Sequence, residues 1–167
     1  TAPPQDTTSS PKEATSSESK VPTEYKGKLF RFSTGPDQNG YMDVTGKTII
    51  PPLEGAYTND FSEGLAAIGY PVKNTQETMH LDKYGIDVIV NESVNYGFID
   101  KTGQVVIKPM FTYVEPFKNG LAHVTITTEE GQRQGFINKK GDFVIKPTYE
   151  FVSKTFSDNL ARYEHDG

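Results

Sequence analysis

The feature of this chain that most restricts its fold is an internal repeat of about 38 residues. The segment YGFIDKTGQVVIKP at 96–109 aligns without a gap with QGFINKKGDFVIKP at 134–147, so that Gly97 corresponds to Gly135. A second landmark follows in both copies, FKNGLA at 117–122 and FSDNLA at 156–161, with a single insertion before it in the later copy. Such a chain is expected to bury its apolar side chains by stacking similar short units.

A third copy lies nearer the N-terminus. The segment GYMDVTGKTIIPP at 40–52 matches the second copy with Gly40 aligned on Gly97, and its landmark FSEGLA at 61–66 matches FKNGLA. The extra chain before the second copy contains LDKYGIDVIV at 81–90, which resembles 99–108 and predicts a degenerate hairpin. An unrelated long loop is the alternative. The repeats are therefore placed at about 39–68, 96–126 and 134–163, with an insertion at about 69–95.

The residues of each copy match a β-hairpin. In the middle copy, Asp100 and Gly103 take the first and fourth turn positions, where a carboxylate can accept backbone N–H groups and glycine tolerates a positive φ. Aromatic and aliphatic residues precede the turn and β-branched residues follow it, as is typical of paired strands. No stretch shows a helical period of apolar residues. The sequence predicts an all-β fold, an array of short hairpin or meander repeats with three copies and one degenerate hairpin. The equivalent turn residues are Asp43 and Gly46, and Asn138 and Gly141.

Further expectations concern how the repeats end and stack. A proline follows each second strand and is expected to end it, because proline cannot donate a ladder hydrogen bond. The Gly-Leu-Ala landmark begins an alternating run that predicts a third strand. Stacking of neighbouring repeats is expected to bury one apolar face of each. The prolines are Pro52, Pro109 and Pro147, and the expected core of the middle repeat is Ile99, Val106, Phe117 and Leu121.

The first residues differ in composition from the rest. From Thr1 to Thr23 the only aliphatic residues are Ala2, Ala14 and Val21, among Ser, Thr, Pro and charged residues. Such a segment cannot bury enough apolar surface to offset its ordering entropy, so residues 1–24 are predicted to be a disordered leader or tether. A tether of this composition favours an extracytoplasmic location, in the periplasm, at the cell surface or secreted, with a possible lipid anchor upstream. A flexible cytosolic tail is the alternative, and 25–167 is the predicted repeat domain.

Charge and composition argue against several classes of function. The net charge of −5 and the isoelectric point near 5.2 argue against a nucleic-acid partner, which needs a basic face. No apolar run is long enough for membrane insertion. The chain has no cysteine, and His80, His123 and His165 share no ligand spacing, so no metal or cofactor is predicted. No nucleophile elbow or phosphate-binding loop occurs, so the sequence does not predict an enzyme.

The repeated motifs resemble the WG repeat family of bacterial proteins. The resemblance rests on GFID at 97–100, Gly103, Pro109 and GLA at 120–122, with equivalents in the other copies. One departure is the absence of tryptophan, since the family's signature position holds Asn39, Tyr96 and Gln134. The resemblance implies a binding or scaffolding array, often exported, without a common chemistry.

These observations predict a non-enzymatic binding or scaffold module whose partner is a protein or a glycan at the cell surface. Tyrosine combines contact area with a polar tip, and Tyr96, Tyr113 and Tyr149 are the candidate ligand-binding residues. A structural spacer that projects another domain is the alternative. A hydrolase that uses the repeat-borne carboxylates Asp82 and Asp100 is a further possibility. Both carboxylates, like Asp43, are at turn positions, where turn geometry alone explains them.

Overall fold

The computed structural model describes residues 25–54, 56–71, 77–90, 94–149, 151–157 and 160–164, with side chains up to Thr148 apart from Glu54. Every regular element in these ranges is a strand, which confirms the predicted all-β fold. No helix long and apolar enough to cross a membrane occurs in this part of the chain. The predicted leader at 1–24 lies outside the described residues.

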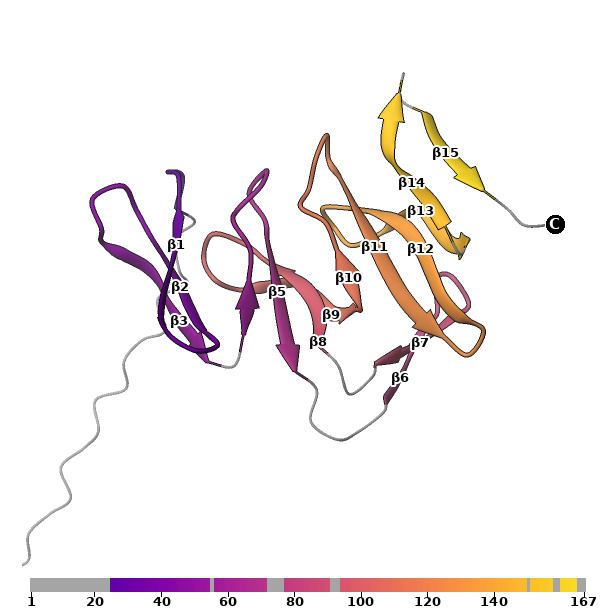
Figure 1. Ribbon diagram of the computed structural model, residues 1–167, viewed down its shortest axis with the longest axis horizontal. Helices are drawn as coiled ribbons and strands as arrows, with labels where there is room; N and C mark the ends of the chain where they lie inside the picture. The colour runs from indigo at the N-terminus through magenta and orange to yellow at the C-terminus, as the bar shows by residue number, and fades with distance from the viewer. Residues whose placement is uncertain are drawn as a thin grey trace, which may run out of the picture.

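The strands form small antiparallel sheets that follow one another across the molecule (Figure 1). The first sheet contains β1 (Phe30–Gly35), β2 (Gln38–Met42) and β3 (Thr48–Glu54). The second contains β4 (Tyr57–Thr58), β5 (Ala66–Pro71), β8 (Val94–Ile99) and β9 (Val105–Phe111). The third contains β10 (Tyr113–Val114), β11 (Leu121–Thr128), β12 (Gly131–Asn138) and β13 (Phe143–Tyr149). Two hairpins form two-stranded sheets of their own, β6 (Glu77–Leu81) with β7 (Ile86–Val90), and β14 (Phe151–Ser157) with β15 (Leu160–Glu164).

The sheets do not coincide with the sequence repeats. The third strand of each repeat pairs with the first strand of the next, so that β5 pairs with β8 and β11 pairs with β12. Strand β1 takes the same place beside β2, with Arg31 opposite Tyr41 as Ala67 is opposite Phe98. The three predicted strands per repeat are therefore present, but each sheet is shared between consecutive repeats. Residues 30–35 supply the third strand of a further, partial unit that the sequence comparison did not detect.

The repeated turns have the predicted geometry. The Oδ1 atom of Asp100 accepts hydrogen bonds from the backbone N–H groups of Thr102 (2.8 Å) and Gln104 (3.2 Å). Gly103 has a φ of 85°, in the left-handed region that glycine tolerates. Asp43 and Asn138 accept the equivalent backbone bonds in the other repeats. In all three turns, a side-chain oxygen at the first turn position accepts the same two backbone N–H groups. The oxygen belongs to a carboxylate in two turns and to an amide in the third.

The prediction that proline ends the second strand is wrong. Strands β3, β9 and β13 all continue past the proline, and the ladder shifts register there. The missing donor costs little because the bulge leaves that position unpaired. The repeated glycine lets the two strands lie close together at this point. A Cβ on Gly97 would lie 2.2 Å from the carbonyl oxygen of Ile107 and 2.7 Å from the nitrogen of Pro109.

The core consists of aromatic and aliphatic side chains that stack from one repeat to the next. Phe98 and Phe117 meet edge to face, with ring centroids 4.8 Å apart, and both are buried. Tyr41 and Phe61 repeat this pair in the first copy at 4.7 Å. Ile99 is also buried, as predicted.

The prediction that Val106 belongs to the core is wrong, because its side chain is 45% exposed. Alternation along β9 directs the next residue, Ile107, into the core, and Leu121 is only half-buried. The turn of the following repeat covers this isoleucine, since a Cβ on Gly141 would lie 3.4 Å from it. Gly103 covers Ile50 in the same way, so these two turns each cover an isoleucine of the preceding repeat.

The insertion contains the predicted hairpin, β6–β7, which lies beside β11 and β9 (Figure 1). Val88 is fully buried in the cluster that holds the Phe98–Phe117 pair. The hydroxyl oxygen of Tyr84 accepts a hydrogen bond from the N–H of Phe143 at 2.9 Å. The insertion therefore helps to join the second and third sheets.

The turn of this hairpin differs from the repeated turns, and the equivalence of Asp82 with Asp100 is wrong. The N–H groups of Tyr84 and Gly85 both bond to the carbonyl oxygen of Leu81, which closes a shorter loop. The carboxylate of Asp82 points to solvent and lies 3.5 Å from His80.

Candidate functional site

The best candidate for a binding site is a groove at the edge where the three sheets meet. Its floor and walls come from β1, β2 and β8 and from the two short strands β4 and β10. The groove has a volume of about 400 Å³, within the usual range of ligand sites. Its lining residues are Arg31, Asn39, Tyr57, Thr58, Asn59, Tyr96, Thr112, Tyr113 and Val114.

Two half-exposed tyrosines from successive repeats line this groove. Tyr57 is opposite Gly69 in the β4–β5 pair, and Tyr113 is opposite Thr125 in the β10–β11 pair, so they occupy equivalent positions. Their side chains are 42% and 44% exposed, unlike the buried rings of the core. The hydroxyl of Tyr113 donates to Glu115 at 3.1 Å, which holds its ring in place. The groove therefore presents two aromatic surfaces at its entrance.

Hydrogen bonds from below hold the side chain of Asn39 and the backbone of Asn59 in the groove. The side-chain nitrogen of Asn39 donates to the carbonyl oxygen of Ala56 at 3.1 Å, which fixes the orientation of its amide. The hydroxyl of Tyr41 donates to the carbonyl oxygen of Asn59 at 2.6 Å. Burial raises the pKa of Tyr41, so this hydroxyl remains a donor at neutral pH. Asn59 itself is exposed at the groove.

Arg31 supplies the positive charge of the groove. Its Nη1 donates to the carbonyl oxygen of Thr58, which fixes the guanidinium against the wall. Its Nε lies 4.0 Å from a carboxylate oxygen of Asp60, and the two side chains are 44% and 83% exposed. An ion pair of this length and exposure contributes little. These contacts occupy only part of the five N–H donors of the guanidinium.

The structure brings together two of the three predicted site residues. Tyr96 and Tyr113 line the same groove. The side chain of Tyr149 lies outside the described ones, but its backbone pairs with Gln134 as Phe111 pairs with Tyr96. Tyr149 thus occupies the position of a core aromatic, and it is not equivalent to Tyr113.

Sequence reasoning missed Tyr57, Arg31 and the two asparagines. A signal for Tyr57 was present, because it precedes the FSEGLA landmark at the same spacing as Tyr113 precedes FKNGLA. No sequence signal placed Arg31 there, since only the pairing of β1 with β2 brings it beside Asn39.

Of the two carboxylates considered for hydrolysis, Asp100 has a structural role and Asp82 is exposed. The carboxylate of Asp100 accepts the backbone N–H groups of its own turn, and Asp82 lies beside His80 on the inserted hairpin. His80 also contacts Asp87 at 2.5 Å, and this hydrogen bond raises the pKa of the imidazole. Within the described ranges, no three His, Asp or Glu side chains are grouped closely enough to hold a metal ion.

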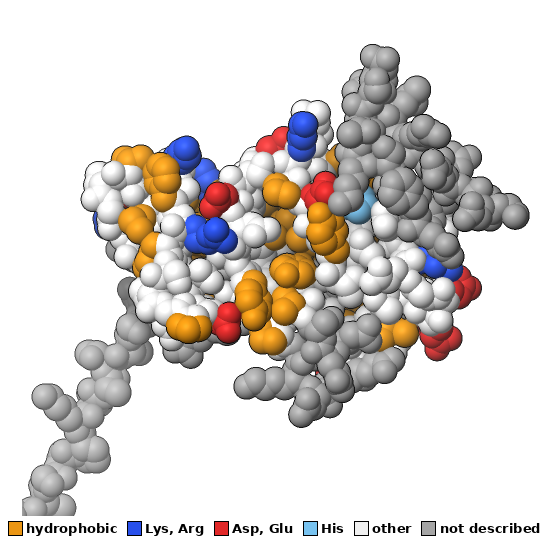
Figure 2. All heavy atoms as spheres, viewed as in Figure 1, with side chains coloured by type: hydrophobic (Ala, Val, Ile, Leu, Met, Phe, Trp, Pro, Cys, Tyr) orange, Lys and Arg blue, Asp and Glu red, His pale blue; other side chains and the backbone are white. Residues whose placement is uncertain are grey.

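Charged side chains do not gather into one stripe on the face seen in Figure 2, where Lys and Arg are scattered among hydrophobic groups.

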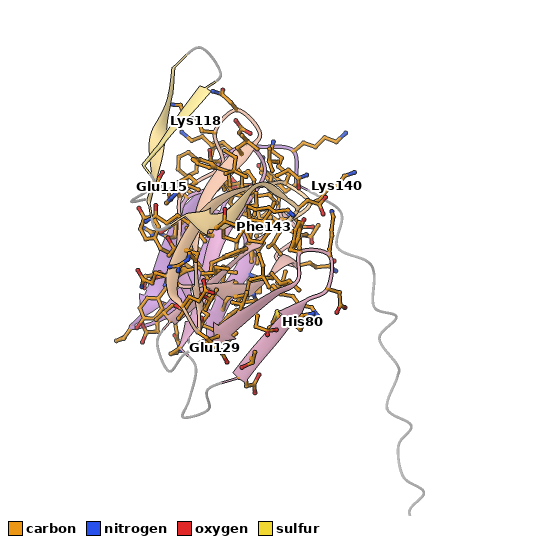
Figure 3. The ribbon with its side chains drawn as sticks, turned by 90° about the vertical axis from the view of Figure 1, so that its right-hand side faces the viewer. His80, Glu115, Lys118, Glu129, Lys140 and Phe143 are labelled. Carbon is orange, nitrogen blue, oxygen red and sulfur yellow. The ribbon has the colours of Figure 1, made fainter. Side chains whose placement is uncertain are left out.

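A second depression lies beside Gly85, Thr128 and Pro147, with Asp87 and Arg133 among its lining residues. Figure 3 shows Glu115 and Lys140 on opposite sides of the array. The side of the short strands, where Glu115 lies, is therefore separate from the side of the repeated turns.

Comparison with known proteins identifies the repeat. The family model described as the WG containing repeat matches residues 40–69, 96–126 and 135–167. These three matches cover more than half of the chain and coincide with the copies found by internal comparison. No curated protein and no solved structure matches the chain. Because the three matches together cover more than half of its residues, the chain belongs to the WG containing repeat family.

Proposed function

We propose that this protein is a non-enzymatic binding module whose ligand occupies the inter-repeat groove between Tyr57 and Tyr113. The observation that carries the proposal is the convergence of half-exposed tyrosines from successive repeats on one groove. Most large aromatic side chains of the described core are buried, whereas these two remain open to solvent. Tyrosine is favoured at binding surfaces because a rigid ring gives area with little loss of conformational entropy.

The remaining recurrent residues support this division of roles. The turn aspartates, the close-packed glycines and the paired phenylalanines are each used by the fold itself. The rings of Tyr57 and Tyr113 are instead half-exposed at the groove, although Tyr113 also meets His123 edge to face. A composition typical of a tether precedes the repeats, so we propose that the module acts outside the cytoplasm on a surface protein or glycan.

Binding to a glycan array and to proteins of the cell surface tests the proposal. Three proteins are compared: the wild type, a double variant with Tyr57→Ala and Tyr113→Ala, and a Phe30→Ala control. Phe30 is a matched exposed aromatic on β1, 40% exposed, and it is not among the residues that line the groove. We expect a partner that the wild type and the control retain and the double variant loses. Absence of any partner, or binding that survives the double substitution, would contradict the proposal.

A further inference from the structure

The groove lies in a repeating architecture, so its side chains can be compared with those one repeat further along. Asn59 and Glu115 occupy equivalent positions, because their N–H groups make equivalent hydrogen bonds. The N–H of Asn59 bonds to the carbonyl oxygen of Ala67, and the N–H of Glu115 bonds to the carbonyl oxygen of His123. The same frame relates Arg31 to Ala67 through their strand partners.

The polar chemistry of the groove does not recur. Arg31 is replaced by Ala67 one repeat along, and Asn59 by Glu115. Asn39 is replaced by Tyr96 in the position before the repeated glycine. The aromatic position does recur, as Tyr57 and Tyr113. The groove is therefore lined by three tyrosine rings, two amides and one cation. The residues that replace Arg31, Asn39 and Asn59 one repeat along are an alanine, a tyrosine and a carboxylate.

These groups have the chemistry that recognises an acidic sugar. The exposed ring faces of Tyr57 and Tyr113 carry negative charge density, which attracts the C–H groups on the apolar face of a pyranose ring. The amides of Asn39 and Asn59 can donate to and accept from sugar hydroxyls. Arg31 can bind a carboxylate through parallel N–H donors, and its bond to Thr58 already holds the guanidinium in place.

From this combination we infer that the groove lined by Arg31, Tyr57 and Tyr113 binds an oligosaccharide that carries carboxylates, such as a chain of uronic acids. The inference rests on the proposed function and adds the chemical class of the ligand. An acidic peptide would also satisfy the cation, but aromatic rings flanked by amides match the apolar face and the hydroxyls of a sugar. The equivalent positions in the next repeat offer no cation for such a carboxylate, because Ala67 takes the place of Arg31.

Isothermal titration calorimetry at low salt tests the inference with three probes: tetragalacturonic acid, the neutral sugar maltotetraose and the peptide hexaglutamate. We expect the wild type to bind tetragalacturonic acid more tightly than either other probe. Loss of a charge-assisted hydrogen bond in Arg31→Gln should weaken that binding roughly tenfold or more and leave maltotetraose unchanged. Lys108→Gln removes an exposed cation of β9 and serves as the matched control. Arg31→Lys should restore part of the affinity, and equal melting temperatures confirm folding.

Several results would overturn the inference. Equal affinity for maltotetraose would show that the carboxylate is not recognised, and equal affinity for hexaglutamate would show that the sugar is not. An equal loss in Lys108→Gln would show non-specific attraction to a cation. Absence of sugar binding, together with a surface partner that still depends on Tyr57 and Tyr113, would reject the ligand class and leave the proposed function standing.

Discussion

Replacing Gly97 with alanine tests the account of how the repeats pack. The new Cβ would lie 2.2 Å from the carbonyl oxygen of Ile107, whereas ordinary contacts of this kind begin at 3.4 Å. Strand β9 would have to move away by about 1 Å, and it carries the buried side chains of Ile107 and Phe111. Overpacking of this kind costs about 1–3 kcal/mol, and partial exposure of two buried side chains adds to it.

We therefore expect Gly97→Ala to lower the free energy of unfolding by about 3 kcal/mol, a large fraction of the roughly 5–15 kcal/mol typical of a domain. For a chain of this length the corresponding loss in melting temperature is roughly 6–12 °C. Urea unfolding followed by far-ultraviolet circular dichroism and tyrosine fluorescence measures it, since the chain has no tryptophan.

Two other glycines separate steric contact from backbone strain. A Cβ on Gly35 would meet its nearest atom, Oε1 of Gln38, at 3.5 Å, and its φ is not positive, so Gly35→Ala should change stability by less than about 0.5 kcal/mol. A Cβ on Gly46 meets nothing within 4 Å, but its φ of 84° predicts a cost of about 1–2 kcal/mol. If Gly97→Ala costs no more than Gly35→Ala, the close-packing explanation of the repeated glycine is wrong.

Three further predictions concern single side chains. Asp100→Ala should lower stability by about 1–2 kcal/mol in urea unfolding because turn N–H groups lose their acceptor, whereas Asp100→Asn should be nearly neutral, since Asn138 makes the same bonds. Phe117→Ala should lower the free energy of unfolding by about 3–5 kcal/mol in the same assay, because it leaves a cavity beside the buried ring of Phe98. The Lys139 ammonium and the N–H of Gly120 hold the pKa of Glu63 below its usual 4.5. The ionised Glu63 carboxylate therefore stabilises the fold at pH values above 4.5, and this stabilisation is lost as the pH falls through the lowered pKa. The difference in melting temperature between the wild type and Glu63→Gln should therefore be largest near neutral pH and shrink in acid, and a constant difference would contradict this linkage.

The sequence predicts the local structure of this protein better than its sheet pairing. The turn at Asp100–Gly103 is determined by residues within it, so its geometry could be derived from side-chain chemistry alone. The continuation of β9 past Pro109 could not, because it depends on a register shift and on a glycine in the neighbouring strand. The sharing of sheets between repeats was also hidden, since a meander pattern does not say which repeat supplies the partner strand.

The candidate site shows the same limit. Tyr96 and Tyr113 could be proposed from residue type, but the prediction that grouped them with Tyr149 ignored its place in the repeat, where the equivalent Phe111 is buried. Arg31 enters the groove only because β1 takes the place of a third strand beside β2. A site assembled by pairing between distant segments has no signature in any one of them.

Tyrosine-resolved nuclear magnetic resonance of the whole chain tests the central claim most directly. Ring-labelled tyrosine reports on the groove through Tyr57, Tyr96 and Tyr113, and on the inserted hairpin through Tyr84, which packs against Phe143. On addition of a ligand identified by the glycan array or surface-protein assay, the three groove tyrosines should shift while Tyr84 stays unchanged. Shifts at Tyr84 or other tyrosines, with the three groove resonances unchanged, would show that binding occurs elsewhere and contradict the account.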